Sequence, residues 1–199
     1  MDKLTNFEKV VLYLVDKSPG LCKVQIRKGL FLFDSLYYSF YKRSYTNCIY
    51  IKEKYGPVPN REYYIKLSNI LFDYANATIE CQGFYEKTSY YLKRNIALDD
   101  FFDEHIKKLL NTVIRFISNK TASEISKLTH GKVYNSTKMY SRINLEDTVE
   151  WIIDKDDSVP NKLEIRDISK EEKDYIINYF LGESDVFTNS RKEKATVNS

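Results

Sequence analysis

The sequence predicts a mainly α fold (α+β): a helical domain with a small antiparallel sheet or hairpin and an extra C-terminal helix. Apolar residues recur at helical spacing in several segments, and short stretches with strand-like alternation lie between them. Hydrophobic residues make up 43% of the 199 residues, which is enough for a buried core. We expect residues 1–153 to form the helical domain, residues 154–182 a linker and the C-terminal helix, and residues 183–199 a disordered tail.

The first two helices follow from a cap and from the spacing of apolar residues. Thr5 and Glu8 have the spacing of a capping box, so the first helix should begin there and end at the break over residues 18–20. A second helix should run from about residue 22 to residue 41. Its centre, residues 30–33, is apolar on every side, which is typical of a helix at the middle of a domain.

The next segment combines a strand with a run of turn residues. Residues 47–54 alternate enough to predict a strand, and Pro57 and Pro59 are expected to end it, because proline donates no ladder hydrogen bond. The later elements expected from the same signals are a helix over 61–74 capped by Asn60, a hairpin over 78–82 and 87–93, helices over 98–117 and 122–128, a short helix over 145–153, and a last helix over 170–181.

Composition limits the classes of function. With 31 Lys and Arg against 28 Asp and Glu, the formal net charge of +3 is too mild to indicate nucleic acid or an anionic membrane by itself. No stretch reaches the roughly 18 apolar residues of a membrane-spanning helix, and the N-terminus lacks the pattern of a signal peptide. The three cysteines form no C-x-x-C pair, which favours reduced thiols. We therefore expect a cytoplasmic protein without a membrane partner.

The common catalytic motifs are missing. The sequence contains no G-x-S-x-G, H-E-x-x-H, G-x-x-x-x-G-K-[ST] or G-x-G-x-x-G pattern. We expect the cysteines to pack in the core, and His130 to end a helix rather than to act as a metal ligand or catalytic base. The aspartates at 154, 156 and 157 lack the pattern of a calcium loop and favour a solvated linker. The sequence thus predicts no enzymatic activity, no metal and no cofactor.

Three segments occur in a recognisable order. Residues 28–34 read K-G-L-F-L-F-D, residues 55–58 read Y-G-P-V, and residues 122–130 read A-S-E-I-S-K-L-T-H. Together, over about residues 4–141, they resemble the Panacea domain, the SocA-like antitoxin family of bacteria and their phages. Gly29 replaces a usual leucine, and the tryptophan that often follows the family's histidine is missing.

This resemblance implies an antitoxin that neutralises a toxin by direct protein contact. It also implies a link to phages or plasmids, and some relatives act as adaptors that present the toxin to a protease. A homo-oligomer is compatible with the sequence. The partner-binding residues expected around the proline-rich turn are Tyr55, Gly56, Pro57, Val58, Tyr63 and His130. Two alternatives involve no partner. In the first, the turn only redirects the chain; in the second, Lys28 and Asp34 form an internal ion pair instead of a contact site.

A helix-turn-helix DNA-binding regulator of phage or plasmid origin is the alternative function. The first two helices and the break between them have the order of that motif, and the later hairpin would be a wing. Lys23, Arg27 and Lys28 lie at the start of the second helix, where a recognition helix contacts bases. The apolar centre of the same helix argues against this function, because it requires burial.

Overall fold

The structure is a computed structural model that describes residues 4–82, 85–130 and 132–148. Its helices are α1 (Asn6–Lys17), α2 (Lys23–Tyr41), α3 (Arg61–Tyr74), the 3-10 helix η1 (Asp99–Phe101), α4 (Glu104–Ser118), α5 (Ala122–Leu128) and α6 (Lys132–Ser136). Its strands form two antiparallel pairs, β1 (Tyr50–Glu53) with β2 (Gly56–Pro59), and β3 (Ala75–Gln82) with β4 (Tyr85–Leu92). The predicted mainly helical α+β class is confirmed.

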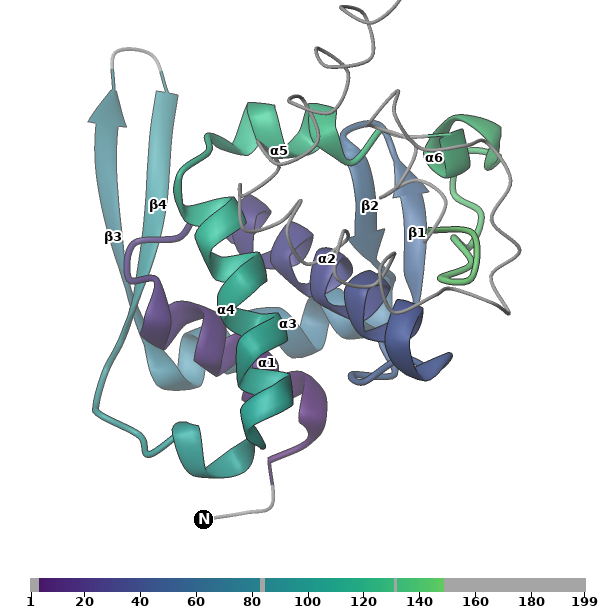
Figure 1. Cartoon of the computed structure of the whole chain (residues 1–199). Helices are drawn as coiled ribbons and strands as arrows, with labels where there is room; N and C mark the ends of the chain where they lie inside the picture. The colour runs from purple at the N-terminus through teal and green to yellow at the C-terminus, as the bar shows by residue number, and fades with distance from the viewer. Residues whose placement is uncertain (1–3, 83–84, 131, 149–199) are drawn as a thin grey trace, which may run out of the picture.

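Helix α2 lies at the centre of the fold and packs against α1, α4, α5 and β2 (Figure 1). Its residues 30–33 are at most 2% exposed, as their all-round apolar character predicts. Gly29 explains how the helices approach so closely. A Cβ at Gly29 would lie 2.9 Å from the Ile117 side chain of α4 and 3.3 Å from the Leu14 side chain of α1.

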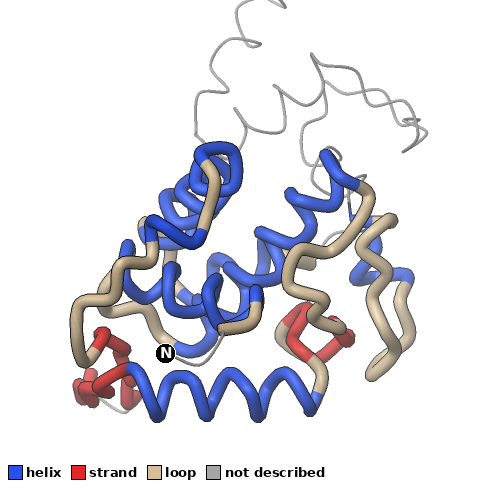
Figure 2. Tube along the Cα trace, turned by 90° about the horizontal axis from the view of Figure 1, so that it is seen from below, coloured by secondary structure: helices blue, strands red, loops and turns tan. Residues whose placement is uncertain are grey.

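The two hairpins lie at opposite ends of α3, which connects β2 to β3 (Figure 2). Asn60 caps α3 as predicted, because its side chain accepts a hydrogen bond from the backbone of Tyr63 at 3.1 Å. The β3–β4 hairpin stands away from the helices along most of its length (Figure 1). This arrangement leaves the β1–β2 hairpin beside α2 and α5, where the candidate site forms.

Local caps set the helix boundaries. The capping box at Thr5 and Glu8 is confirmed. The helix expected from residue 98 begins only at Glu104, because Asp103 is its N-cap and accepts from the backbone of Ile106 at 2.9 Å. The residues before it form η1, where Asp99 pairs with Lys17 of α1 at 2.7 Å instead of lying in the helix.

The strand predicted over residues 47–54 ends at Glu53, before the prolines, but the proline-rich segment does not leave the sheet: it is itself a strand that pairs with β1. The register pairs Pro57 with Lys52, and the amide of Asn60 donates to the carbonyl of Ile49 at 2.7 Å. Backbone groups alternate in direction along a strand, so the nitrogens of Pro57 and Pro59 point away from β1. A two-stranded sheet has only edge strands, and its outer edge tolerates proline.

Several predictions fall outside the described residues. The linker and helix expected over residues 154–182 and the tail over residues 183–199 lie there entirely. Of the short helix expected over residues 145–153, only the first four residues are described. They form a turn in which the amide of Thr148 donates to the carbonyl of Leu145 at 3.1 Å.

Candidate functional site

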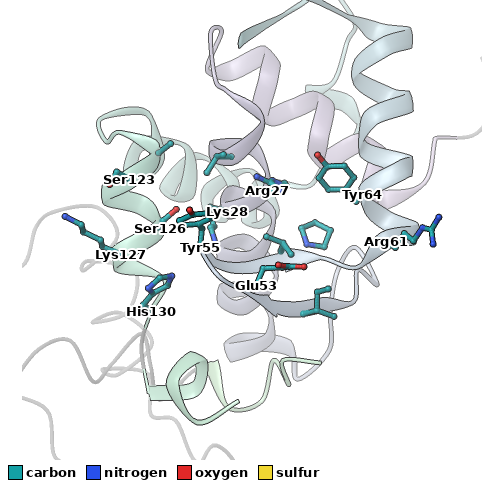
Figure 3. A pocket seen from close by; sticks show the side chains of 15 residues that line it. Arg27, Lys28, Glu53, Tyr55, Arg61, Tyr64, Ser123, Ser126, Lys127 and His130 are labelled. Carbon is teal, nitrogen blue, oxygen red and sulfur yellow. The ribbon is translucent and has the colours of Figure 1, made fainter. Parts of the chain in front are cut away.

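A cleft of about 730 Å³ opens between α2, the β1–β2 hairpin, the start of α3 and α5 (Figure 3). We call it the α2/α5 cleft. Its half-buried lining combines apolar residues such as Val24, Ile51 and Val58 with polar ones such as Arg27 and His130. Its exposed lining consists mainly of aromatic and charged residues and includes Tyr55 and Tyr64. A partly apolar concave surface with a few polar groups is the usual form of a binding site.

A buried lysine joins α2 to the hairpin at the bottom of this cleft. The Nζ atom of Lys28 donates a hydrogen bond to the carbonyl oxygen of Pro57 at 2.8 Å, and Lys28 is only 1% exposed. In a strand, the carbonyl of a residue points to the same side as its nitrogen. The proline that cannot donate to β1 therefore directs its carbonyl to the outer edge, where Lys28 binds it.

All three of the motif segments meet at Gly56. Its φ is +100°, a backbone conformation that side chains disfavour. A Cβ at this position would contact the Nζ atom of Lys28, and it would lie 2.8 Å from Oγ1 of Thr129 and 3.2 Å from the ring of His130. Glycine is thus required here, because α2, the hairpin and the end of α5 converge on its backbone.

His130 is held by an aromatic stack. Its ring is parallel to that of Tyr134 within 2°, with the ring centroids 4.1 Å apart. The hydroxyl of Tyr134 donates to the carbonyl of Glu53 at 2.6 Å, in the hairpin. The tryptophan expected from the family pattern is missing, and Tyr134 packs against the histidine instead.

The charge on Lys28 is disfavoured by its surroundings. Burial lowers the pKa of the Lys28 ammonium to about 7, and the nearby Arg27 guanidinium adds to this effect by repulsion. The ion pair expected between Lys28 and Asp34 does not form, because the two residues are six positions apart. That separation is about 240° around a helix, so they lie on different faces.

Asp34 holds a different part of the chain. Its carboxylate accepts hydrogen bonds from the backbone amides of Tyr45 and Thr46 at 2.9 and 3.0 Å and from the hydroxyl of Tyr50 at 2.8 Å. Burial raises the pKa of the Asp34 carboxyl, and the hydrogen bonds from Thr46 and Tyr50 oppose this shift. Asp34 therefore fixes the loop that leads from α2 into β1.

The structure brings together some of the residues predicted to bind a partner. Tyr55, Val58 and His130 line the α2/α5 cleft, and Tyr55 is 67% exposed. Gly56 and Pro57 were also expected to contact a partner, but both are buried and neither lines the cleft.

Other lining residues were missed from the sequence. Tyr63 was predicted as a contact residue, but it is half-buried, and its ring packs edge-on against Phe7 with centroids 5.1 Å apart. Its neighbours Arg61 and Tyr64 line the cleft instead. Residues three positions apart share one face of a helix. The helix predicted to begin at residue 61 therefore implied that Arg61 and Tyr64 lie side by side.

The basic residues considered for DNA binding divide between two environments. Lys28 is buried, whereas Arg27 lines the cleft. The Nζ atom of Lys23 lies 5.5 Å from the ring centre of Tyr64 and 3.4 Å from Oγ of Ser68, and the Arg27 guanidinium lies 5.5 Å from the same ring. Lys23 and Arg27 thus pack against Tyr64 of α3, whereas Lys28 binds the hairpin.

Among the described residues, the cysteines and acidic residues form no cluster that indicates a metal site. Cys48 is buried, and burial raises the pKa of its thiol, whereas Cys22 is half-buried. Cys81 is exposed on β3, so the expectation that it packs in the core was wrong. Over residues 4–82, 85–130 and 132–148, no three His, Cys, Asp or Glu side chains lie close enough to hold a metal ion. None of the helices described there is long and apolar enough to cross a membrane.

Comparison with known proteins assigns the chain to a family. A family model described as antitoxin SocA-like, Panacea domain, matches residues 26–135, which is more than half of the chain. No curated protein and no solved structure gives a significant match. The matched region contains Lys28, Gly56 and His130, which come from the three segments that meet beside the α2/α5 cleft. The chain belongs to the family of SocA-like antitoxins with a Panacea domain.

Proposed function

We propose that this protein is an antitoxin that neutralises a partner toxin by direct contact through the α2/α5 cleft, and that it acts without catalysing a reaction. Its family membership supports the antitoxin role. One structural observation supports the site. The three motif segments converge on Gly56, and side chains from all three line the same cleft. The residues that identify the family therefore build a surface as well as a core.

The cleft has the side chains that dominate protein interfaces. Tyrosine and arginine contribute a large share of binding energy, because they offer a wide contact area together with hydrogen bonds. Tyr55 is 67% exposed and Tyr64 is 38% exposed at the cleft, and Arg27 lies over the ring of Tyr64. These residues could contact a partner with little rearrangement of the core.

The cleft is also held in shape by nearby hydrogen bonds. Lys28 fixes the hairpin to α2, and Tyr134 fixes its turn to the segment that follows α5. Preformed surfaces bind with a smaller loss of conformational entropy. Neutralisation by direct contact requires such a preformed surface. It does not require a catalytic acid and base that converge on a substrate.

A growth assay with matched variants tests this function. The gene beside the one for this chain is expressed alone and together with the wild-type protein. We expect growth arrest in the first case and rescue in the second. The variant Tyr55→Ala/Tyr64→Ala should fail to rescue, because it removes both aromatic anchors. The control Phe72→Ala/Tyr140→Ala removes two aromatic residues, 80% and 70% exposed, that do not line the cleft, and it should rescue fully.

Two results would contradict the proposal. A neighbouring gene that is harmless on its own would remove the antitoxin role. Equal rescue by both double variants, at equal protein levels, would remove the cleft as the contact site. The toxin level in rescued cells separates direct neutralisation from an adaptor mechanism, because delivery to a protease would lower that level and a stable complex would not.

A further inference from the structure

The α2/α5 cleft carries an excess of positive charge. Arg27, Arg61 and Lys127 line it beside the buried Lys28, whose charge is disfavoured, and Glu53 is the single acidic residue in its lining. The chain as a whole is nearly balanced, with 31 basic and 28 acidic residues, so this excess is local. None of these three cations, Arg27, Arg61 and Lys127, forms an ion pair with a described residue. An anionic ligand would therefore meet cations that no described acidic side chain neutralises.

One of these cations also has an unused donor. The Nε atom of Arg27 is buried and makes no hydrogen bond within the described part of the chain. Buried donors in folded proteins nearly always have a partner. Arginine presents its donors as a planar fork that matches a carboxylate. Arg27 lines the cleft, so the outer nitrogens of its guanidinium can meet an acceptor that a ligand brings there.

The arrangement of charge and apolar surface favours a peptide over a nucleic acid. Arg27 of α2 and Arg61 of α3 lie apart from each other in the cleft lining, and Lys127 of α5 lies on the side opposite Arg61 (Figure 3). Apolar residues such as Val58 also line the cleft. A nucleic-acid backbone requires a continuous basic track. Here Lys28 is buried and tied to Pro57, and the exposed cations are separated. A short protein segment can place an apolar side chain between two carboxylates.

We propose that the α2/α5 cleft binds an acidic segment of the partner, in which an apolar side chain enters the cleft and flanking carboxylates pair with Arg27 and Arg61. This inference rests on the proposed function in one respect, that the partner is a protein. The cleft volume of about 730 Å³ lies within the range of roughly 300–1,000 Å³ that is usual for ligand-binding pockets.

Peptide selection with the full-length chain tests the proposal. A phage-displayed library of random twelve-residue peptides is selected against the wild type, the cleft variant Arg27→Gln/Arg61→Gln and the control variant Lys108→Gln/Arg115→Gln. The control loses the same charge from exposed positions of α4, outside the cleft. Thermal unfolding of each variant checks that it is folded. Enriched peptides are then synthesised with a fluorescent label, and their affinities are measured by polarisation.

The wild type and the control should enrich peptides with two or more carboxylates around a large apolar residue. Their affinity should fall at least tenfold in the cleft variant and when the carboxylates are replaced by amides. The proposal is overturned if no acidic peptides are enriched, if the cleft variant binds them as well as the control, or if a single-stranded oligonucleotide binds more tightly. If the protein rescues growth in the assay above but the selection enriches no acidic peptides, this inference is removed and the antitoxin role remains. If acidic peptides are enriched but the neighbouring gene does not arrest growth, the antitoxin role is removed and the inference about the cleft remains.

Discussion

Replacement of Lys28 by methionine should change how the stability of the protein depends on pH. Lys28 is 1% exposed, and its hydrogen bond to the carbonyl of Pro57 connects α2 to the hairpin. Burial lowers the pKa of its ammonium from 10.5 to about 7. Methionine has a similar length and no titrating group, so the variant removes the buried charge and this hydrogen bond together.

The magnitude follows from the difference in pKa between the folded and unfolded chain. Each pKa unit corresponds to about 1.4 kcal/mol, so the buried charge of Lys28 costs on the order of 5 kcal/mol when the folded protein is fully protonated. The unfolded chain binds this proton more tightly. The free energy of unfolding of the wild type therefore rises with pH between about 7 and 10.5, and this contribution is at its least favourable below pH 7.

Urea unfolding at pH 6, 8 and 10, followed by circular dichroism, measures the effect. The lost hydrogen bond costs the methionine variant about 1.5–3 kcal/mol when the lysine is charged, so the variant should be the more stable protein at pH 6. By pH 10 the wild type should gain on the order of 4 kcal/mol relative to the variant. Other titrating groups are common to both proteins and cancel. A difference that stays constant over this range would refute the low pKa of Lys28 and the burial that causes it.

Three further substitutions should lower the free energy of unfolding, again measured with urea. Gly56→Ala should cost about 3 kcal/mol, because φ is +100° and the new Cβ would contact Lys28; a loss below about 1 kcal/mol would contradict the close convergence at this residue. Asp34→Ala should cost about 3–5 kcal/mol, because it leaves buried donors such as the hydroxyl of Tyr50 without an acceptor; stability equal to that of the wild type would contradict this. Thr121→Ala should cost about 1 kcal/mol through the lost cap of α5, and Thr121→Ser should restore most of it.

The elements that the sequence predicted well are those whose signals are local. The capping box of α1 depends on two residues three positions apart, and it is present in the structure. The centre of α2 is apolar on every side, which is a direct signal of burial. These features required no knowledge of what lies elsewhere in the chain.

The errors concern features that depend on distant partners. A proline is tolerated in a strand when its nitrogen faces an edge that has no neighbouring strand. The sequence of residues 56–59 does not show that β2 has a single neighbour and therefore such an edge. The partner of Lys28 is a backbone carbonyl 29 positions away, which leaves no pattern in the side chains. The cleft itself is formed by segments up to about 100 positions apart, so the lining residues of α5 could not be assigned to it from spacing alone.

Co-purification directly tests whether the protein binds its partner through the α2/α5 cleft. The full-length chain, tagged for affinity purification, is isolated from cells that also express the neighbouring gene, and the eluate is separated by gel filtration. Our account predicts that the two proteins elute as one complex with the wild type and separate with Tyr55→Ala/Tyr64→Ala. Growth rescue without any complex, or a complex that the double variant leaves intact, would contradict neutralisation through the α2/α5 cleft.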